Sequence, residues 1–163
     1  MYQLGHYGVA LLLYAPVAIW LGLAGEEFVA LLGAVICLSF STLPDCDHSL
    51  PFVAHRGITH TIGFVLLVPA VVAGAAYATL EVTMGSPDPT VVGFVYGVTA
   101  LSLGSHLLAD ALTPMGITPF WPLSSYHFSL RVTTAKNPIA NYGLFALGVA
   151  ASVLSIGVVT GGL

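Results

Sequence analysis

The stretch GSHLLADALTPMG, residues 104–116, decides how this chain is interpreted. It places His106 and Asp110 four residues apart near the end of a long apolar segment. On an α-helix these positions lie one turn apart on the same face, so the imidazole and the carboxylate can hold one metal ion between them. Thr113 and Pro114 then end the helix, because proline lacks the N–H group and disfavours helical geometry before it. Ionisable groups inside a membrane helix are costly, and they therefore indicate a functional site.

The overall composition is that of an integral membrane protein. Of the 163 residues, 57% are hydrophobic and 6% are charged, whereas soluble domains have roughly 45–50% apolar and about 25% charged residues. The three basic residues, Arg56, Arg131 and Lys136, are too few for a nucleic-acid-binding surface, so we expect no nucleic-acid partner. We expect residues 1–163 to form a single transmembrane domain.

Five apolar segments are long enough, or nearly so, to cross a bilayer, which takes about 20 helical residues. They cover residues 8–24, 28–43, 58–80, 91–112 and 142–160. The first segment is interpreted as a retained helix rather than a signal peptide, because no Lys or Arg precedes it. The sequence therefore predicts an all-α fold, an integral membrane bundle of about five transmembrane helices.

The charged residues predict the orientation of this bundle. With five crossings, Arg56, Arg131 and Lys136 fall on the same side of the membrane as the N-terminus. The acidic residues on the other side are Glu26, Glu27, Glu81 and Asp88. The positive-inside rule makes the basic side cytoplasmic. We therefore expect a multi-pass protein of the cell (inner or plasma) membrane, with its N-terminus in the cytoplasm and its C-terminus outside.

All six histidines and three of the seven acidic residues map to one end of this bundle. The metal ligands that we expect among them are His6, Asp45, Asp47, His60, His106 and Asp110. Nitrogen and oxygen ligands from four segments suit Zn²⁺, with Mn²⁺ or Fe²⁺ as alternatives. The set suffices for one closed site or for two adjacent open sites. In the second case His6 would complete the ligands of the second ion, and a carboxylate such as Asp110 would bridge the two ions. Whether Asp45 or Asp47 ligates stays open.

Other polar residues at this end have two interpretations each. His55 is either a further ligand or a general base. Arg56 is either a clamp for an anionic substrate group or an anchor of the positive-inside kind. His48 and His127 are interpreted as supporting or surface residues. Each side chain alone has an ordinary structural explanation, but their gathering at one end of so apolar a chain favours a metal site.

These motifs resemble a known family. The sequences LPDCDH (residues 43–48), HRGITH (55–60) and SHLLADALTPMGI (105–117), with a histidine near the N-terminus, are similar to those of the YdjM-like family. Its members are bacterial and archaeal proteins described as LexA-regulated, metal-dependent hydrolases of the inner membrane. The third motif fits the family pattern S-H-x-x-x-D-x-x-T-P-x-G, whereas Thr61 stands where serine is usual. A more distant similarity to zinc-dependent phospholipase C implies phosphoester hydrolysis.

The sequence and this resemblance together favour an enzyme. The hypothesis is a membrane-embedded, metal-dependent hydrolase with its site at the cytoplasmic interface, where a metal-activated water attacks a phosphoester or lipid-like substrate. Its expected partners are membrane lipid and a small-molecule or lipid substrate. One alternative is an ion- or proton-coupled transporter, although transporters place their polar groups near the midplane. The other is a non-catalytic membrane protein in which a structural metal joins four segments.

Overall fold

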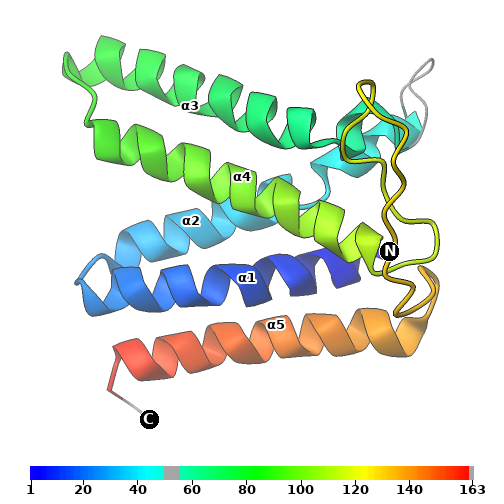
Figure 1. The fold of residues 1–163 in the computed structure, drawn as a ribbon. Coiled ribbons are helices and arrows are strands. Elements are labelled where there is room, and N and C mark those ends of the chain that lie inside the picture. Colours follow the sequence, from blue (N-terminus) through cyan, green and yellow to red (C-terminus); the bar gives the residue numbers. More distant parts are fainter. Residues whose placement is uncertain (50–55, 162–163) are drawn as a thin grey trace.

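The computed structural model describes residues 1–49 and 56–161, and five long helices run side by side in it (Figure 1). They are α1 (Gln3–Leu23), α2 (Glu27–Phe40), α3 (Ile62–Met84), α4 (Pro89–Ala111) and α5 (Pro138–Val159). In the described residues no β-strand forms, and a single antiparallel bridge joins Ile117 to Phe128. The predicted all-α fold is confirmed.

All five helices are long and apolar enough to cross a membrane, when α2 is counted with the 3₁₀ turn that follows it, as Glu27–His48. Large apolar side chains are exposed on their outer faces, for example Leu67 and Val71 of α3 and Val153 of α5. Such continuous apolar surface is unfavourable in water and is matched by lipid tails. The expected bundle of five transmembrane helices therefore has the lengths and surface that a bilayer requires.

Side-chain caps determine the residues at which the helices begin. The apolar pattern alone predicted these first residues less accurately. The hydroxyl of Thr61 accepts a hydrogen bond from the Phe64 N–H at 3.1 Å, so α3 begins at Ile62 and not at residue 58. Asp88 caps α4 in the same way, through the Thr90 N–H at 2.7 Å. The segment before Thr61 is thereby left free to form a short 3₁₀ turn that carries a histidine.

The core of the bundle lies where α1 packs against α2 and α4. Tyr14, Cys37 and Val98 are buried there, one from each of these helices. The Tyr14 hydroxyl donates to the Ala30 carbonyl at 2.8 Å, and the Ser102 hydroxyl donates to the Cys37 carbonyl. Polar groups inside a membrane bundle must be satisfied internally, and these bonds do so while fixing the three helices relative to one another.

Helix α5 packs against α1 through glycines. A Cβ atom added to Gly8 would lie 2.4 Å from the Leu144 carbonyl carbon, and one added to Gly148 would lie 2.5 Å from the Gly8 carbonyl oxygen. The two backbones therefore touch, as small residues permit between membrane helices. This contact holds α1, and with it the histidine in its first turns, in a fixed position.

The polar segments gather at the end of the bundle where the N-terminus lies, opposite the C-terminus (Figure 1). They are the 3₁₀ turns η1 (Leu43–Ser49) and η2 (Ile58–His60) and the loop between α4 and α5. Arg56 and the basic residues of that loop, Arg131 and Lys136, all belong to this end. The separation of charge expected from the sequence is therefore present in the fold.

Candidate metal centre

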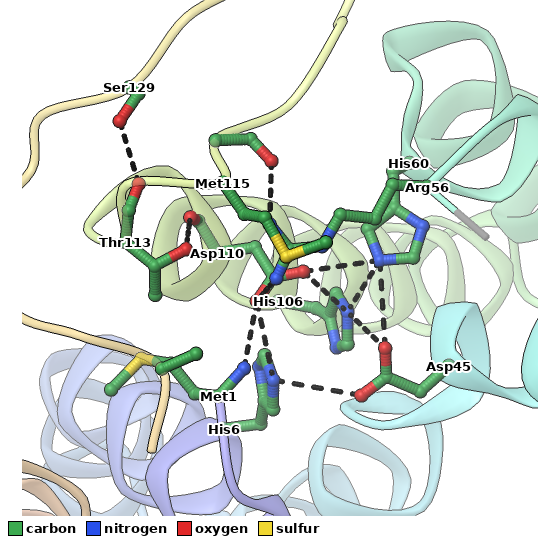
Figure 2. Close-up of polar contacts among 12 residues, drawn as sticks. Met1, His6, Asp45, Arg56, His60, His106, Asp110, Thr113, Met115 and Ser129 are labelled. Atoms are coloured by element: carbon green, nitrogen blue, oxygen red, sulfur yellow. Dashed lines mark hydrogen bonds and ion pairs between the residues drawn. The ribbon is translucent and has the colours of Figure 1, made fainter. Parts of the chain in front are cut away.

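Five of the six expected metal ligands meet at this end of the bundle (Figure 2). His6 comes from the first turns of α1, Asp45 from η1 and His60 from η2, and His106 and Asp110 come from the last two turns of α4. The three imidazoles and Asp110 are 0% exposed, whereas the Asp45 side chain is 29% exposed. The cluster is therefore buried, with one accessible edge at Asp45.

Four of these side chains direct one ligand atom each toward a common point. His60 Nε2 lies 3.6 Å from Asp45 Oδ1 and 3.2 Å from Asp110 Oδ2. His106 Nε2 lies 3.5 Å from Asp45 Oδ1 and 3.8 Å from Asp110 Oδ2. Two atoms that each bind one zinc ion at about 2.0–2.2 Å lie at most about 4.4 Å from each other. All four donor atoms lie within 4.8 Å of one another, so together they could hold a single divalent ion.

Hydrogen bonds on the far side of the rings turn two histidines toward the cluster. The His106 Nδ1–H donates to the Ser41 carbonyl at 2.7 Å. His60 Nδ1 lies 2.9 Å from the hydroxyl of Thr59, which itself donates to Asp47 at 2.7 Å, so the ring donates to the hydroxyl. Both Nε2 atoms then face the cluster, 3.2 Å apart. Two nitrogen lone pairs so placed repel unless a proton or metal ion lies between them, and the arrangement therefore fits a bound cation.

Asp47, the sixth expected ligand, lies behind His60 and not beside its Nε2 atom. Its carboxylate is 2% exposed, accepts hydrogen bonds from Thr59 and from the Arg56 backbone N–H at 3.1 Å, and lies 3.5 Å from His60 Nδ1. Metal-binding histidines commonly have a carboxylate on the other ring nitrogen. Of the two aspartates, Asp45 is thus the one that reaches the converging ligand atoms, and Asp47 is placed to orient His60.

Negative charge around His60 changes its proton affinity. Burial of the ring opposes protonation, but the carboxylates of Asp110 and Asp45 outweigh burial and raise the pKa of His60 above its ordinary value. Without a metal, the cluster therefore favours holding a proton at this ring. A divalent ion that binds there would displace that proton, as metal binding to histidine generally does.

Arg56 points into the cluster. Its Nη2 lies 2.8 Å from Asp110 Oδ1, its Nη1 donates to the Gly116 carbonyl at 2.8 Å, and its side chain is 11% exposed. The backbone of Arg56 has a φ of 61°, a left-handed conformation that costs a non-glycine residue on the order of 1 kcal/mol and persists where surrounding contacts hold it. This geometry favours a role inside the site over an anchor at the lipid headgroups.

The turn after α4 also supports the site. The contacts that this turn makes could not be predicted from the sequence. The Thr113 hydroxyl donates to the Asp110 carbonyl at 2.8 Å and closes the last turn of the helix. Gly116 has a φ of 55°, and a Cβ atom there would lie 2.3 Å from the Phe128 carbonyl oxygen, so only glycine fits. Its own carbonyl receives Arg56. Backbone acceptors such as this one leave no signal in the residue pattern.

The other expected residues lie at the margin of the cluster or beyond it. The His48 side chain is 61% exposed, and its ligand atoms form a second group with Asp45 and Asp47 in which all lie within 4.8 Å. His127 is exposed and donates through Nε2 to the Met115 carbonyl at 2.8 Å. His55, expected as a ligand or general base, lies outside the described residues. His48 and His127 therefore lie at the surface of this end of the bundle, and their roles stay a prediction.

Fold and site together define a multi-pass membrane protein with a buried His/Asp cluster at one end. The sequence model of the YdjM inner membrane protein family matches residues 1–161, so the chain belongs to that family, as the resemblance of its motifs predicted. The family's description gives a membrane and no chemical activity. Comparison with curated proteins found no match, and neither did comparison with solved structures.

Proposed function

We propose that this protein is a metal-dependent hydrolase whose site opens at the cytoplasmic end of the bundle. The observation that carries the proposal is the convergence of Asp45, His60, His106 and Asp110 from three separate segments onto one point. Ionisable groups inside a membrane bundle are energetically costly, so a set of them at one point indicates a function. Zn²⁺ suits these nitrogen and oxygen donors best, with Mn²⁺ and Fe²⁺ as alternatives.

Each residue around the cluster has a separate role in the proposed hydrolysis. A bound divalent ion supplies a Lewis acid, which acidifies water and polarises a phosphoryl or carbonyl oxygen. Arg56 carries the charge and the planar donor set that bind an anionic substrate group. Asp47 holds the His60 ring in place through Thr59. Asp45 forms the most exposed edge, so substrate would enter there.

A phosphoester at the membrane surface is the substrate class that this location supports. The histidines and carboxylates come from the start of α1, from η1 and η2 and from the end of α4, where the apolar segments begin and end. A headgroup of a lipid in the same membrane reaches this depth without leaving the bilayer. The Arg56 guanidinium beside the cluster favours an anionic group over a neutral one.

One observation favours a second candidate, a structural metal. Four protein donors are also the number found in closed structural zinc sites, whereas catalytic sites keep one position for water or substrate. In that case the ion would only join η1, η2 and α4. The two candidates differ in whether the metal-loaded protein turns over any substrate and in whether the bundle folds without metal.

The first test is the metal content of the purified full chain, prepared without chelator. His106→Ala and Asp110→Asn should lose the metal, since each removes a converging donor. The controls His127→Ala and Asp88→Asn make the same chemical changes away from the cluster and should retain it. Circular dichroism checks that every variant is folded. Folded wild-type protein that takes up no metal, even when metal is offered, would overturn the proposal.

The second test is turnover by the metal-loaded protein. Phosphate release from phosphatidic acid and from soluble phosphoesters, in detergent micelles, should be measurable for wild type and for His127→Ala. It should fall to background for His106→Ala. A metal-loaded wild type that cleaves none of these substrates, and that unfolds when stripped of metal, would instead establish the structural metal.

A further inference from the structure

We propose that a groove between α2 and α5 binds one acyl chain of a membrane lipid whose headgroup carries an ammonium group. The groove lies in the half of the bundle away from the His/Asp cluster, so the proposal does not rest on the proposed hydrolase. It assigns a lipid site to a face of the protein that the candidate metal centre does not use.

Helix α1 forms the floor of this groove, and α2 and α5 form its walls. Figure 1 shows α1 between these two helices, and α1 packs against both of them. On α1 the groove follows a single face from Leu11 through Ala15 and Ala18 to Gly22. Three of these four side chains are small, so they leave a cavity of about 370 Å³.

The length of the groove matches one leaflet of a bilayer. At 1.5 Å per residue, Gly22 lies about 16 Å from Leu11 along α1. Half of the hydrocarbon core is about 15 Å thick. The groove reaches Val159 and Thr160, where α5 ends, so it meets the membrane surface at this end of the bundle. A lipid in this leaflet can therefore place one chain along the groove, with its headgroup at the surface.

The lining suits an apolar ligand and offers little to a polar one. Each serine, threonine and tyrosine hydroxyl in the groove already donates to a backbone carbonyl. A hydroxyl has one hydrogen to donate, so none is left for a ligand. Apart from Glu27, the other lining residues are apolar. An acyl chain in the groove would supply the dispersion contacts that an unfilled space lacks.

The volume of the groove favours a single chain over a transmembrane helix. A helix is about 10 Å across, so a 16 Å length of it occupies on the order of 1,000 Å³. This is more than twice the volume of the groove. An acyl chain is much thinner than a helix and can lie along the floor formed by α1.

Charge at the mouth of the groove selects the headgroup. Glu27, the first residue of α2, lines the groove, and Glu26 precedes it in the turn after α1. Both side chains are exposed, and the Lys and Arg residues of the chain all belong to the other end of the bundle. The mouth is therefore negative. It attracts the ammonium group of a zwitterionic lipid and repels a headgroup with a net negative charge.

The test is a lipid titration of the full chain in detergent, with bound lipid counted by native mass spectrometry. The two probes are dioleoyl phosphatidylethanolamine and dioleoyl phosphatidylglycerol, which have the same acyl chains and differ in their headgroups. Wild type should bind one molecule of the ethanolamine lipid up to about fivefold more tightly, the factor that an exposed ion pair supplies.

Two variants separate the contributions of chain and headgroup. Ala18→Phe fills the groove and should lose both lipids, whereas Ala70→Phe makes the same change on the exposed face of α3 and should retain them. Glu27→Gln should reduce the preference for the ethanolamine lipid. Its control, Glu81→Gln, removes an exposed carboxylate near the end of α3 and should leave the preference unchanged.

Three results would overturn the lipid site. Wild type that retains neither lipid has no site, and wild type that binds both equally has no headgroup preference. A wild-type dimer that Ala18→Phe converts to a monomer would make the groove an interface between two copies. The comparison of the two lipids on wild type decides the question even where Ala18→Phe does not fold. Failure of the metal or hydrolysis tests leaves this proposal intact.

Discussion

The geometry of the cluster depends on what each imidazole binds with its far nitrogen. His106 is held by a backbone carbonyl, that of Ser41, and His60 by the hydroxyl of Thr59. Each bond fixes both the tautomer and the direction in which Nε2 points. Ligand atoms at suitable distances are therefore a result of the partners behind the rings as much as of the histidines themselves.

Asp47 provides the residue-scale prediction. Asp47→Asn keeps the shape of the side chain but removes the charge that supports Thr59 and His60. Metal affinity should fall by about 10–100-fold, the usual effect of losing such a supporting carboxylate. Competition with a fluorescent zinc chelator measures this affinity.

Asp88→Asn is the matched control, since it makes the same change at the N-terminus of α4, at the other end of the bundle, where asparagine also caps a helix. Its affinity for metal should equal that of wild type. An Asp47→Asn variant with unchanged affinity would mean that Asp47 contributes only to local structure.

The helices place these residues through packing contacts outside the cluster itself. Helix α1 is fixed against α5 by direct backbone contact at Gly8 and Gly148, and against α2 and α4 by the buried Tyr14 and Cys37. The position of His6 is therefore determined by the packing of the whole first helix. A shift of α1 along α5 would move His6 away from both carboxylates.

The packing of α1 against α5 can be tested at Gly8. Gly8→Ala places a methyl group 2.4 Å from the Leu144 backbone, so α1 and α5 must separate. Overpacking of this kind costs typically about 1–3 kcal/mol, and the thermal midpoint in detergent should fall.

Gly143→Ala is the control on the same helix pair, because a Cβ atom at Gly143 meets nothing within 4 Å. Its midpoint should stay the same or rise, given the higher helix propensity of alanine. Equal midpoints for the two variants would contradict the close contact.

At the scale of the whole molecule, the charged residues and the cluster share one end of the bundle. The basic residues lie at the cluster end, and acidic residues lie at the turns of the other end. From the positive-inside rule we predict that the cluster lies at the cytoplasmic face. An enzyme with this arrangement would act on substrates in the inner leaflet.

Thiol labelling tests this orientation. Cys46 is exposed at the cluster end, whereas Cys37 is fully buried. In intact cells a membrane-impermeant maleimide should leave Cys46 unmodified, and labelling should appear once the membrane is opened. Ser86 is exposed in the turn between α3 and α4, so Ser86→Cys in a Cys46→Ser background should be labelled from outside. The reverse pattern would invert the bundle and place the site outside the cell.

Removal of metal tests how far the bundle depends on the cluster. The most extensive helix contacts are those of α1 with α5 and α2 and of α3 with α4, and the buried core of Tyr14, Cys37 and Val98 lies outside the cluster. The stripped protein should therefore keep its helical circular dichroism signal while its thermal midpoint falls. Metal at about 100 times its dissociation constant contributes about 2.7 kcal/mol to stability. Loss of the helical signal on stripping would favour the structural metal over the hydrolase.

Local properties of the chain were sufficient to predict the fold class and the end of the bundle at which the site lies. Apolar runs give the number of helices, and the order of crossings brings the histidines and Asp45, Asp47 and Asp110 to one end. The first residues of the helices were predicted less accurately than the fold class. Caps such as Thr61 act through single hydrogen bonds, and an apolar pattern does not contain these.

The sequence by itself thus determined an all-helical membrane protein of the YdjM family with histidine and aspartate side chains gathered at one end. Only the tertiary structure decided which atoms meet. Asp45 and Asp47 are two residues apart and chemically identical, and their different positions follow from how η1 packs against η2 and α4. The bond from His106 to Ser41 joins residues 65 positions apart. Such contacts exist only once the helices are packed, because the direction of a side chain depends on neighbours that are distant in the sequence.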